Sequence, residues 1–228
     1  MKKINITIRG DNEFVIQEAF KTLRTNIQFC GQDTKVIGIT SYGENEGKTT
    51  ICLSIGKSFA ELGKRTLIVD ADMRKSVIVG RNTDTNNAVG LSEVLTGLTT
   101  LDNSIYSTQY TGLDILFAGK YPPNPVELLN GKYFASIINA AREFYDYILI
   151  DSPPIGMVID ASVIATQCDG MIFVIGNPRV HYGQLLDSVE QIRKSKCRIL
   201  GVVRNFTLPN GGRYYKKGVY YKSAYGKK

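Results

Sequence analysis

The sequence has few of the residues on which metal, disulfide and nucleophile-relay sites usually depend. It contains one histidine, His181, and four widely spaced cysteines that form no Cys-x-x-Cys pair: Cys30, Cys52, Cys168 and Cys197. A single histidine argues against a multi-histidine metal site and against a histidine-based nucleophile relay. The cysteine spacing argues against a zinc site and a disulfide framework, so we interpret the cysteines as small core residues in a reducing compartment.

Long apolar segments are also missing. No apolar run approaches the roughly 18 residues of a membrane-spanning helix, and the alternating Ile-Asn-Ile-Thr-Ile after the basic first residues is no signal-peptide core. A hydrophobic fraction of 43% and a charged fraction of 21% are typical of a globular protein, and 228 residues suffice to bury a sizeable core. We therefore expect one α/β domain without a membrane span.

The net charge of +7 is unevenly distributed along the chain. Residues 207–228 contain six basic side chains and no acidic one, which leaves +1 for residues 1–206. This last segment is rich in Gly, Lys and Tyr and shows no periodicity. We predict a domain over residues 1–206 and a flexible, basic, tyrosine-rich tail over residues 207–228.

The most informative stretch is Ser-Tyr-Gly-Glu-Asn-Glu-Gly-Lys-Thr-Thr at 41–50. It follows an apolar run that is typical of a buried strand and precedes a segment with helical spacing. A strand, a glycine-bearing loop and Gly-Lys-Thr at a helix start form a phosphate-binding loop, because the free N–H groups and partial positive charge there hold phosphate oxygens. We predict that Lys48 reaches the β- and γ-phosphates of a nucleotide and that the Thr49 hydroxyl binds Mg²⁺.

The loop departs from the usual pattern at one position. Glycine is expected five residues before Gly47, where this chain has Tyr42, and Gly43 comes one place later. The alternative is a chance Gly-Lys-Thr, which the preceding strand and the acidic strand ends make the weaker interpretation. The nucleotide-binding candidates of the loop are Gly43, Glu46, Gly47, Lys48, Thr49 and Thr50.

Carboxylates end two apolar strands. Asp70 closes a Leu-Ile-Val run, Asp72 lies two residues beyond it, and Asp151 closes Tyr-Ile-Leu-Ile. Ligands of an open α/β sheet bind at the carboxyl ends of its strands, where the phosphate-binding loop also lies. We predict Mg²⁺ ligands in Thr49, Asp72 and Asp151, and we expect one of Asp70 and Asp72 to orient metal-bound waters while the other accepts the proton of an attacking hydroxyl. The alternative for each acid alone is a helix cap or turn.

Two further residues complete the candidate site. Arg74 would add positive charge at a transferred phosphoryl group, so the catalytic candidates are Lys48, Asp70, Asp72 and Arg74. Asn205 follows the last strand, and its amide could bind adenine, although a turn-forming asparagine is an equal alternative. ATP and Mg²⁺ are the expected cofactors.

The rest of the chain alternates strands and helices. Runs rich in β-branched residues predict strands at 36–40, 65–70, 113–117, 147–151, 171–175 and 198–203. Helices are predicted at 13–29, 51–62, 92–95, 126–129, 133–144, 160–167 and 184–194, a short extended arm at 1–10, and a polar loop at 75–90. This alternation predicts a P-loop NTPase-like α/β fold, with a mostly parallel central sheet and helices on both faces.

The helix predicted at 13–29 carries one polar face. Glu18, Lys21 and Arg24 recur every three residues and therefore share it. From the spacing alone we favour a solvated face with ion pairs within the helix. A contact between subunits is the alternative.

The tail carries five tyrosines within twelve residues: Tyr214, Tyr215, Tyr220, Tyr221 and Tyr225. They are acceptor hydroxyls tethered to a predicted phosphoryl-transfer site, which indicates autophosphorylation. Each phosphotyrosine adds roughly −1.5 to −2 charge, so five would change the tail from +6 to about −2 to −4. The alternative is a basic and aromatic segment that binds nucleic acid or an anionic membrane surface.

Taken together, these segments resemble the bacterial protein-tyrosine kinases (BY-kinases) of capsule and exopolysaccharide synthesis, in particular the kinase subunit of Gram-positive bacteria. The resemblance covers nearly the whole chain in order. Its pieces are Glu-Ala-Phe-Lys-Thr-Leu-Arg-Thr-Asn (18–26), Glu-Gly-Lys-Thr-Thr (46–50), Leu-Ile-Val-Asp-Ala-Asp-Met-Arg (67–74), Gly-Leu-Ser-Glu-Val-Leu-Thr-Gly (90–97), Tyr-Ile-Leu-Ile-Asp-Ser-Pro-Pro (147–154) and the tyrosine cluster.

The resemblance implies an ATP-dependent tyrosine autokinase in which Asp70 and Asp72 handle the acceptor hydroxyl and Mg²⁺ and Asp151 is the Walker B carboxylate. It also implies a homo-oligomeric ring, such as an octamer, built through Glu18, Lys21 and Arg24, and it makes the subunit contact the favoured interpretation of that face. The family's central arginine is Lys21 here.

The resemblance further implies partners and a location. The expected partners are a transmembrane activator of the polysaccharide co-polymerase type and a cognate tyrosine phosphatase, with no nucleic acid. The expected location is the cytoplasm, at the inner face of the membrane.

The competing hypothesis is a partition or division-site ATPase, a dimeric switch on membrane or DNA. Such proteins carry an extra lysine near the start of the phosphate loop, whereas residues 41–46 contain none, and the tyrosine tail has no role in that scheme. A nucleotide-sensing subunit without catalysis is a third class.

Overall fold

The computed structural model describes residues 2–10, 13–85, 88–176 and 182–207. Its strands are β1 (Lys2–Lys3), β2 (Val36–Ser41), β3 (Thr66–Asp70), β4 (Ile105–Ser107), β5 (Leu113–Leu116), β6 (Tyr147–Asp151), β7 (Gly170–Ile175) and β8 (Ile199–Arg204). Its helices are α1 (Phe14–Phe29), α2 (Lys48–Glu61), α3 (Ile78–Asn82), α4 (Leu91–Leu95), α5 (Leu101–Ser104), α6 (Pro125–Leu129), α7 (Lys132–Phe144), α8 (Asp160–Ala165) and α9 (Tyr182–Lys194). None of the helices in these ranges combines the length and apolarity that a membrane span requires.

The strands form one sheet in the order β1-β4-β5-β3-β6-β2-β7-β8. Every neighbouring pair is parallel except β4 and β5. β2, β3 and most of β6 and β7 are fully buried, which explains why their sequences are near-continuous apolar runs. The predicted α/β fold with a mostly parallel sheet is confirmed.

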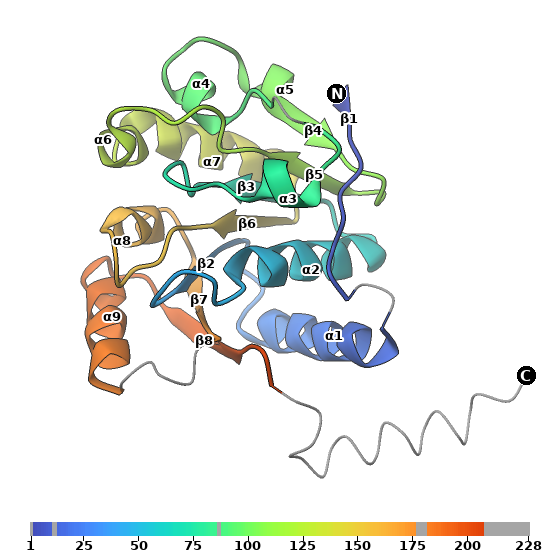
Figure 1. The fold of residues 1–228 in the computed structure, drawn as a ribbon, viewed down its shortest axis with the longest axis vertical. Coiled ribbons are helices and arrows are strands. Elements are labelled where there is room, and N and C mark those ends of the chain that lie inside the picture. Colours follow the sequence, from blue (N-terminus) through green and yellow to red (C-terminus); the bar gives the residue numbers. More distant parts are fainter. Residues whose placement is uncertain (1, 11–12, 86–87, 177–181, 208–228) are drawn as a thin grey trace, which may run out of the picture.

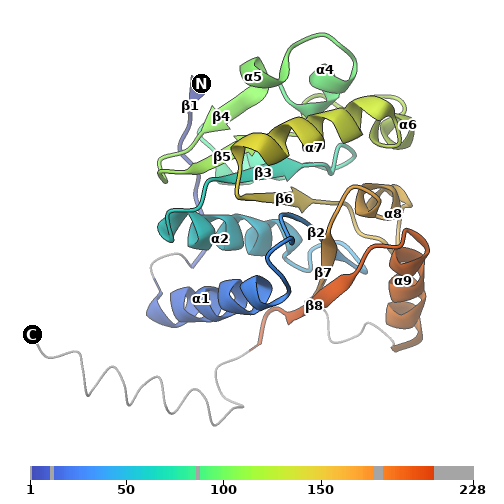
Figure 2. The same cartoon turned by 180° about the vertical axis from the view of Figure 1, so that it is seen from behind.

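Helices cover both faces of the sheet (Figures 1 and 2). On one face, α1 and α2 pack over a core that includes Ile27, Ile37 and Phe59. On the other face, α4, α6 and α7 pack over a second core, and α8 and α9 pack over a third beside β7. α2 lies close to β3, because a Cβ on Gly56 would stand 2.7 Å from Cδ1 of Ile68.

The structure corrects one prediction and adds elements that the periodicity did not indicate. Residues 75–90 were predicted to be a polar loop, but α3 lies within them and Thr83 forms an antiparallel bridge with Ile6. The loop prediction was wrong because α3 is one and a half turns long and buries only Ile78, too little for a helical pattern. β1, α5 and β4 were also missed, since each has four residues or fewer.

The polar face of α1 is partly occupied within the protomer. Lys21 forms an ion pair with Glu18 at 2.8 Å, as the spacing indicated. Arg24 instead reaches α2, where its Nη1 donates to the carbonyl oxygen of Ser58 at 2.6 Å. The proposed role of this face in a ring is not tested by these contacts.

The amino-terminal ends of the central strands are tied together by one carboxylate. Asp169, just before β7, accepts hydrogen bonds from the N–H groups of Lys35 and Val36 at 2.9 and 2.7 Å. Arg142 of α7 donates to both of its oxygens at 2.9 and 2.8 Å. Burial opposes ionisation of Asp169, but these donors outweigh it and hold its pKa below the ordinary 3.8.

We expect Asp169→Asn to lower the free energy of unfolding by about 1–3 kcal/mol at pH 7, because asparagine keeps the shape but loses the charge-assisted hydrogen bonds. A depressed folded pKa stabilises the protein above the unfolded pKa, so the difference from wild type should shrink as the pH falls from 3.8 through the lower folded pKa. Urea unfolding at a series of pH values measures this. The exposed Asp33→Asn is the control, and an equal effect of the two variants at pH 7 would contradict the prediction.

Candidate functional site

The sheet brings the carboxylates and the phosphate-binding loop to one edge. β6 lies between β3 and β2, and the register places Asp70 directly beside Asp151 and Asp151 beside Ile39. The loop that follows β2 therefore begins next to both acids. This arrangement depends on parallel strands ending at the same edge, which is where α/β sheets bind their ligands.

The end of the loop has a conformation that favours glycine. Gly47 has φ of 90° and immediately precedes Lys48, the first residue of α2. A Cβ on Gly47 would lie 2.0 Å from Nδ2 of Asn205, so a side chain there would clash as well as strain the backbone. The glycine leaves the N–H groups at the start of α2 unobstructed, as a phosphate requires.

Glu46 holds the loop in shape. It is 2% exposed; its Oε1 accepts from the N–H of Gly43 at 2.6 Å, and its Oε2 accepts from the N–H of Gly176 after β7 at 2.8 Å. Asn205 adds a second brace, because its Nδ2 donates to the carbonyl oxygen of Glu46 at 3.0 Å. Both side chains thus support the loop through its backbone.

Tyr42 replaces the expected glycine because it has a packing role. A Cβ on Gly156 would stand 2.6 Å from the Tyr42 ring, and the N–H of Gly156 donates to the Tyr42 carbonyl at 3.1 Å. The ring therefore packs closely on the segment that follows β6. This contact links the phosphate-binding loop to the chain just beyond Asp151.

Asp151 is a deeply buried acid beside Lys48. It is 2% exposed, and its Oδ2 accepts from the Thr49 hydroxyl at 2.6 Å. Its Oδ1 is buried and has no hydrogen-bond partner among the described residues. Burial raises the pKa of Asp151 to about 6, against the opposing effects of Thr49 and Lys48. A buried carboxylate oxygen with no hydrogen-bond partner could bind a cation directly or accept a hydrogen bond from a water molecule on that cation.

Asp70 and Asp72 have different surroundings. Asp70 is 1% exposed; its Oδ2 accepts from the Ser76 hydroxyl at 2.5 Å, and its Oδ1 accepts from the N–H of Asp72 at 3.2 Å. Burial, then the neighbouring Asp151, raises its pKa well above the ordinary value. Asp72 is half-buried and lines the cavity described below, and burial raises its pKa against the field of Lys48.

Arg74 is positioned by a residue that the sequence did not indicate. Its Nε donates to both oxygens of Asp160 at 3.1 and 3.0 Å, and Asp160 is only 1% exposed. Since Asp160 binds Nε alone, the two terminal nitrogens of the guanidinium have no hydrogen-bond partner among the residues that the structure describes and could bind a ligand. Asp160 lies 86 positions along the chain from Arg74, and its one visible feature was its place at a helix start.

These residues surround a cavity of about 180 Å³. Its wall comes from the phosphate-binding loop and α2, from the segment after β3, and from the segment after β6. The lining residues are Glu44, Asn45, Gly47, Lys48, Thr49, Thr50, Asp72, Arg74, Lys75, Val77, Arg81, Asn82, Pro153, Pro154, Met157 and Val158. The apolar part, from Pro153 to Val158, was not predicted from the sequence.

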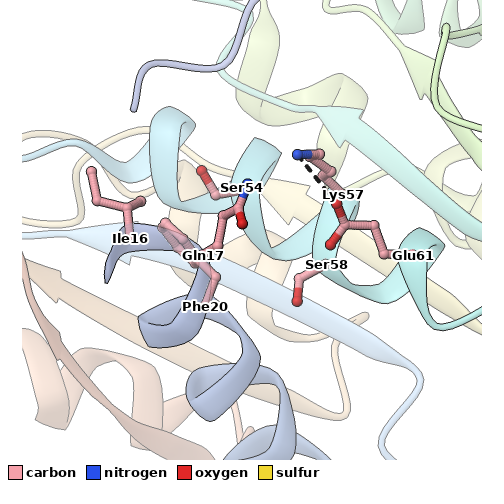
Figure 3. Close-up of a pocket in the computed structure, with 7 residues that line it drawn as sticks. All are labelled: Ile16, Gln17, Phe20, Ser54, Lys57, Ser58 and Glu61. Carbon is pink, nitrogen blue, oxygen red and sulfur yellow. Dashed lines mark ion pairs between the residues drawn. The ribbon is translucent and has the colours of Figure 1, made fainter. Parts of the chain in front are cut away.

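A smaller hollow lies between α1 and α2 (Figure 3). Its volume is about 20 Å³, which is room for roughly one water molecule. Ser54 lines it with a buried hydroxyl that has no partner among the described residues, and Lys57 pairs with Glu61 at its far side. It is too small for a nucleotide, so the larger cavity is the candidate site.

The donor set fits Mg²⁺ better than a metal held by protein alone. The described ranges contain no group of three His, Cys, Asp or Glu side chains arranged to hold a metal ion. Mg²⁺ usually keeps several waters and takes one or two carboxylates plus phosphate oxygens. The Thr49 hydroxyl, the free Oδ1 of Asp151 and the nearby Asp72 could supply this smaller set.

Most predicted site residues meet at this edge of the sheet. Gly43 and Glu46 shape the loop without lining the cavity, and Asn205 lies against Gly47. The five tail tyrosines lie outside the described residues, so their placement is not tested. The candidate oligomer contacts of α1 are not among the residues of this cavity.

The chain is similar to known proteins over most of its length. Residues 34–202 match the family model described as an AAA domain. The chain is 41% identical over 189 residues to the tyrosine-protein kinase CpsD of Streptococcus agalactiae, covering 83% of this chain and 82% of that protein.

Solved structures agree with this match. The chimerical protein CapA2B2 superposes with a TM-score of 0.81 at 31% identity, covering 90% of this chain and 93% of that one. The kinase domain of the Escherichia coli tyrosine kinase ETK superposes with a TM-score of 0.83 at 25% identity, covering 91% and 83%. The septum site-determining protein MinD of Pyrococcus horikoshii, complexed with Mg-ADP, is a more distant match, with a TM-score of 0.61 at 28% identity and coverage of 74% and 69%. By its AAA domain and by its identity to CpsD over most of both chains, this protein belongs to the family of bacterial tyrosine-protein kinases.

Proposed function

We propose that the chain is an ATP-dependent protein-tyrosine kinase that transfers the γ-phosphoryl group of ATP to the tyrosines of its own tail. The observation that carries the proposal is the convergence of Lys48, the Thr49–Asp151 pair and Asp72 on one cavity edge. Hydrolysis alone does not require a cluster of acceptor hydroxyls on a tether, whereas autophosphorylation does. The proposed acceptors are Tyr214, Tyr215, Tyr220, Tyr221 and Tyr225.

Each residue has a role that follows from its surroundings. The N–H groups at the start of α2 and the Lys48 ammonium bind the phosphates. Thr49, Asp151 and Asp72 would hold Mg²⁺, which would neutralise charge on the phosphates. One of Asp70 and Asp72 takes the proton of the attacking phenol while the other orients metal-bound water. Both pKa values are raised, which favours a carboxylate as proton acceptor.

Two more residues act on the ligand. Arg74, fixed through its Nε by Asp160, stabilises negative charge on the transferred group. Asn205 uses its Nδ2 for Glu46, which leaves its amide oxygen to accept from the adenine amino group.

The cellular role proposed here is regulation of capsular or extracellular polysaccharide synthesis and export. It is supported by the identity to CpsD and by the superposition on CapA2B2. The proposed setting is the inner face of the membrane, with a transmembrane activator of the polysaccharide co-polymerase type and a tyrosine phosphatase as partners. Glu18, Lys21 and Arg24 are the proposed ring contacts.

A partition or division-site ATPase is the second candidate, because MinD shares the fold. The lower coverage, the absence of lysine from residues 41–46 and the tyrosine cluster all favour the kinase. Nucleotide hydrolysis without labelling of tyrosine would favour the ATPase.

We expect wild-type protein incubated with ATP and Mg²⁺ to gain phosphate on tail tyrosines, and Lys48→Met to lose at least about 100-fold in rate, because the ammonium on the phosphates is gone. Intact-protein mass spectrometry, with an activator peptide where needed, follows the added phosphates. Lys64→Met, which removes a lysine away from the cavity, is the matched control. Equal labelling of Lys48→Met and wild type would refute the proposed site.

A second prediction distinguishes the role of the tail's tyrosine hydroxyls from the role of its basic residues. Changing all five tail tyrosines to phenylalanine keeps the six basic residues and should abolish phosphate incorporation while ATP hydrolysis to water persists. Deletion of residues 213–228 should have the same effect on incorporation. Unchanged labelling in the phenylalanine variant would place the acceptors elsewhere in the chain.

A further inference from the structure

The cavity is lined by four cationic side chains: Lys48, Arg74, Lys75 and Arg81. They differ in whether they already form an ion pair with an acidic side chain. Arg74 is paired with Asp160, and Lys75 is paired with Glu44 at 2.6 Å. Arg81 forms no ion pair with any of the residues that the structure describes. Its side chain is exposed at the cavity wall, so its charge remains available to an anionic ligand.

Arg81 lies on α3, a helix too short to be stable without contacts from the rest of the protein. α3 has five residues, buries only Ile78 and has no side-chain cap at its start. An isolated helix of this length is unstable in water, so contacts from elsewhere must fix it. The position of Arg81 therefore depends on what packs against α3 and the residues just after it.

Those contacts come from the arm, which we define as residues 2–8. The N–H of Thr7 donates to the Asn82 carbonyl at 2.7 Å, and Nδ2 of Asn82 donates back to the Thr7 carbonyl at 2.7 Å. Asn5 donates from its backbone and its side chain to the carboxylate of Asp84 at 3.2 and 3.1 Å. Between them, Ile6 bridges Thr83. The arm is thus hydrogen-bonded to Asn82 and Asp84, on either side of Thr83 and just after Arg81.

The other side of the arm is fixed to the sheet. The N–H of Ile4 donates to the Ser107 carbonyl at 3.0 Å, and Ile6 exchanges two hydrogen bonds with the Gln109 side chain at 2.8 and 2.6 Å. Ile4, Ile6 and Ile8 are 7%, 3% and 6% exposed, so alternate residues of the arm enter the core. Figure 1 shows this blue segment running from β4 past α3 towards α1.

We propose that the arm is a positioning strap for α3 and that Arg81, which it holds at the cavity wall, supplies positive charge to the phosphoryl group during transfer. The inference rests on the proposed kinase function. An arginine that has no counter-ion among the described residues, at the wall of a cavity that also contains Lys48 and Asp72, stabilises charge that develops on the transferred oxygens.

In the proposed function, the nucleotide binds to the phosphate-binding loop, and the arm does not contribute to the contacts that brace this loop. The phosphate-binding loop is braced by Glu46 against Gly176 and by Asn205. Loosening α3 should therefore reduce the rate of transfer and leave nucleotide affinity nearly unchanged. This separation distinguishes a positioning role from general destabilisation.

The first part of the test concerns Arg81. We expect Arg81→Ala to lower kcat for tail phosphorylation about 10-fold or more, with the Kd for ADP within about twofold of wild type, because a single misplaced or missing charge can cost this much. Arg81→Lys should recover part of the loss. A kcat for Arg81→Ala equal to that of wild type would overturn the assignment.

The second part concerns the arm. Thr7→Pro removes the N–H that donates to Asn82, whereas Thr7→Ala keeps it and changes only an exposed side chain. Thr7→Pro should reproduce the kcat loss and speed hydrogen exchange of residues 78–84, and Thr7→Ala should do neither. The double variant Thr7→Pro with Arg81→Ala should be no slower than Arg81→Ala alone, because the arm acts through Arg81. Additive losses would overturn this coupling.

A further variant covers the case in which Thr7→Pro does not fold. Asn5→Ala removes one side-chain hydrogen bond to Asp84 and should give a smaller change of the same kind in kcat and in exchange. Unchanged exchange of residues 78–84 in Asn5→Ala would count against the strap. If wild type hydrolyses ATP without labelling tyrosine, the kinase proposal fails, while the strap is still tested by hydrogen exchange and by the hydrolysis rate.

Discussion

The burial of carboxylates beside Lys48 is the constraint on which the site depends. Asp70 and Asp151 are neighbours in register on adjacent strands, 1% and 2% exposed, and burial raises the pKa of each. Two such groups repel when ionised and lose hydration, so they destabilise the protein without a cation. Such a loss of folding stability is common at sites whose function requires buried charged groups. In the proposed function, Lys48, the Thr49 hydroxyl and a bound Mg²⁺ would together offset this charge, so the site would reach electrostatic balance only with its ligand.

Much of this could be predicted from the sequence because it depends on short, regular patterns. Strands that are buried on both faces are apolar throughout, and an acid at the end of such a strand must lie at the ligand edge of a parallel sheet. The fold, the loop and the grouping of Asp70 with Asp151 follow from that rule. The family that these patterns resemble is also the family that the comparisons identify.

The parts that were missed depend on contacts between distant positions. Asp160 binds Arg74 across 86 positions, and no local pattern distinguishes it from an ordinary helix-start aspartate. The sequence predicts a loop at α3 because Thr7 and Asn5 of the arm hold Asn82 and Asp84, whereas the helix itself has no apolar spacing. Tyr42 departs from the loop pattern because its ring packs against Gly156, a contact that the local sequence does not indicate. In each case the missing information was a tertiary partner.

The path of the chain out of the domain connects the tail to the same electrostatics. Beyond β8, Asn205 braces Glu46, and the ring of Phe206 lies 3.5 Å from the position of a Cβ on Gly47. The tail therefore leaves the fold beside the phosphate-binding loop. In the proposed function, the +6 charge of the tail would attract it to the phosphates of the nucleotide and to the carboxylates of the site, which would favour delivery of a tyrosine. Because each phosphate adds roughly −1.5 to −2, successive modifications weaken and then reverse that attraction. In the proposed reaction, each added phosphate would thus weaken the attraction that brings the next tyrosine to the site, and the number of tyrosines would set how far the tail's charge can change.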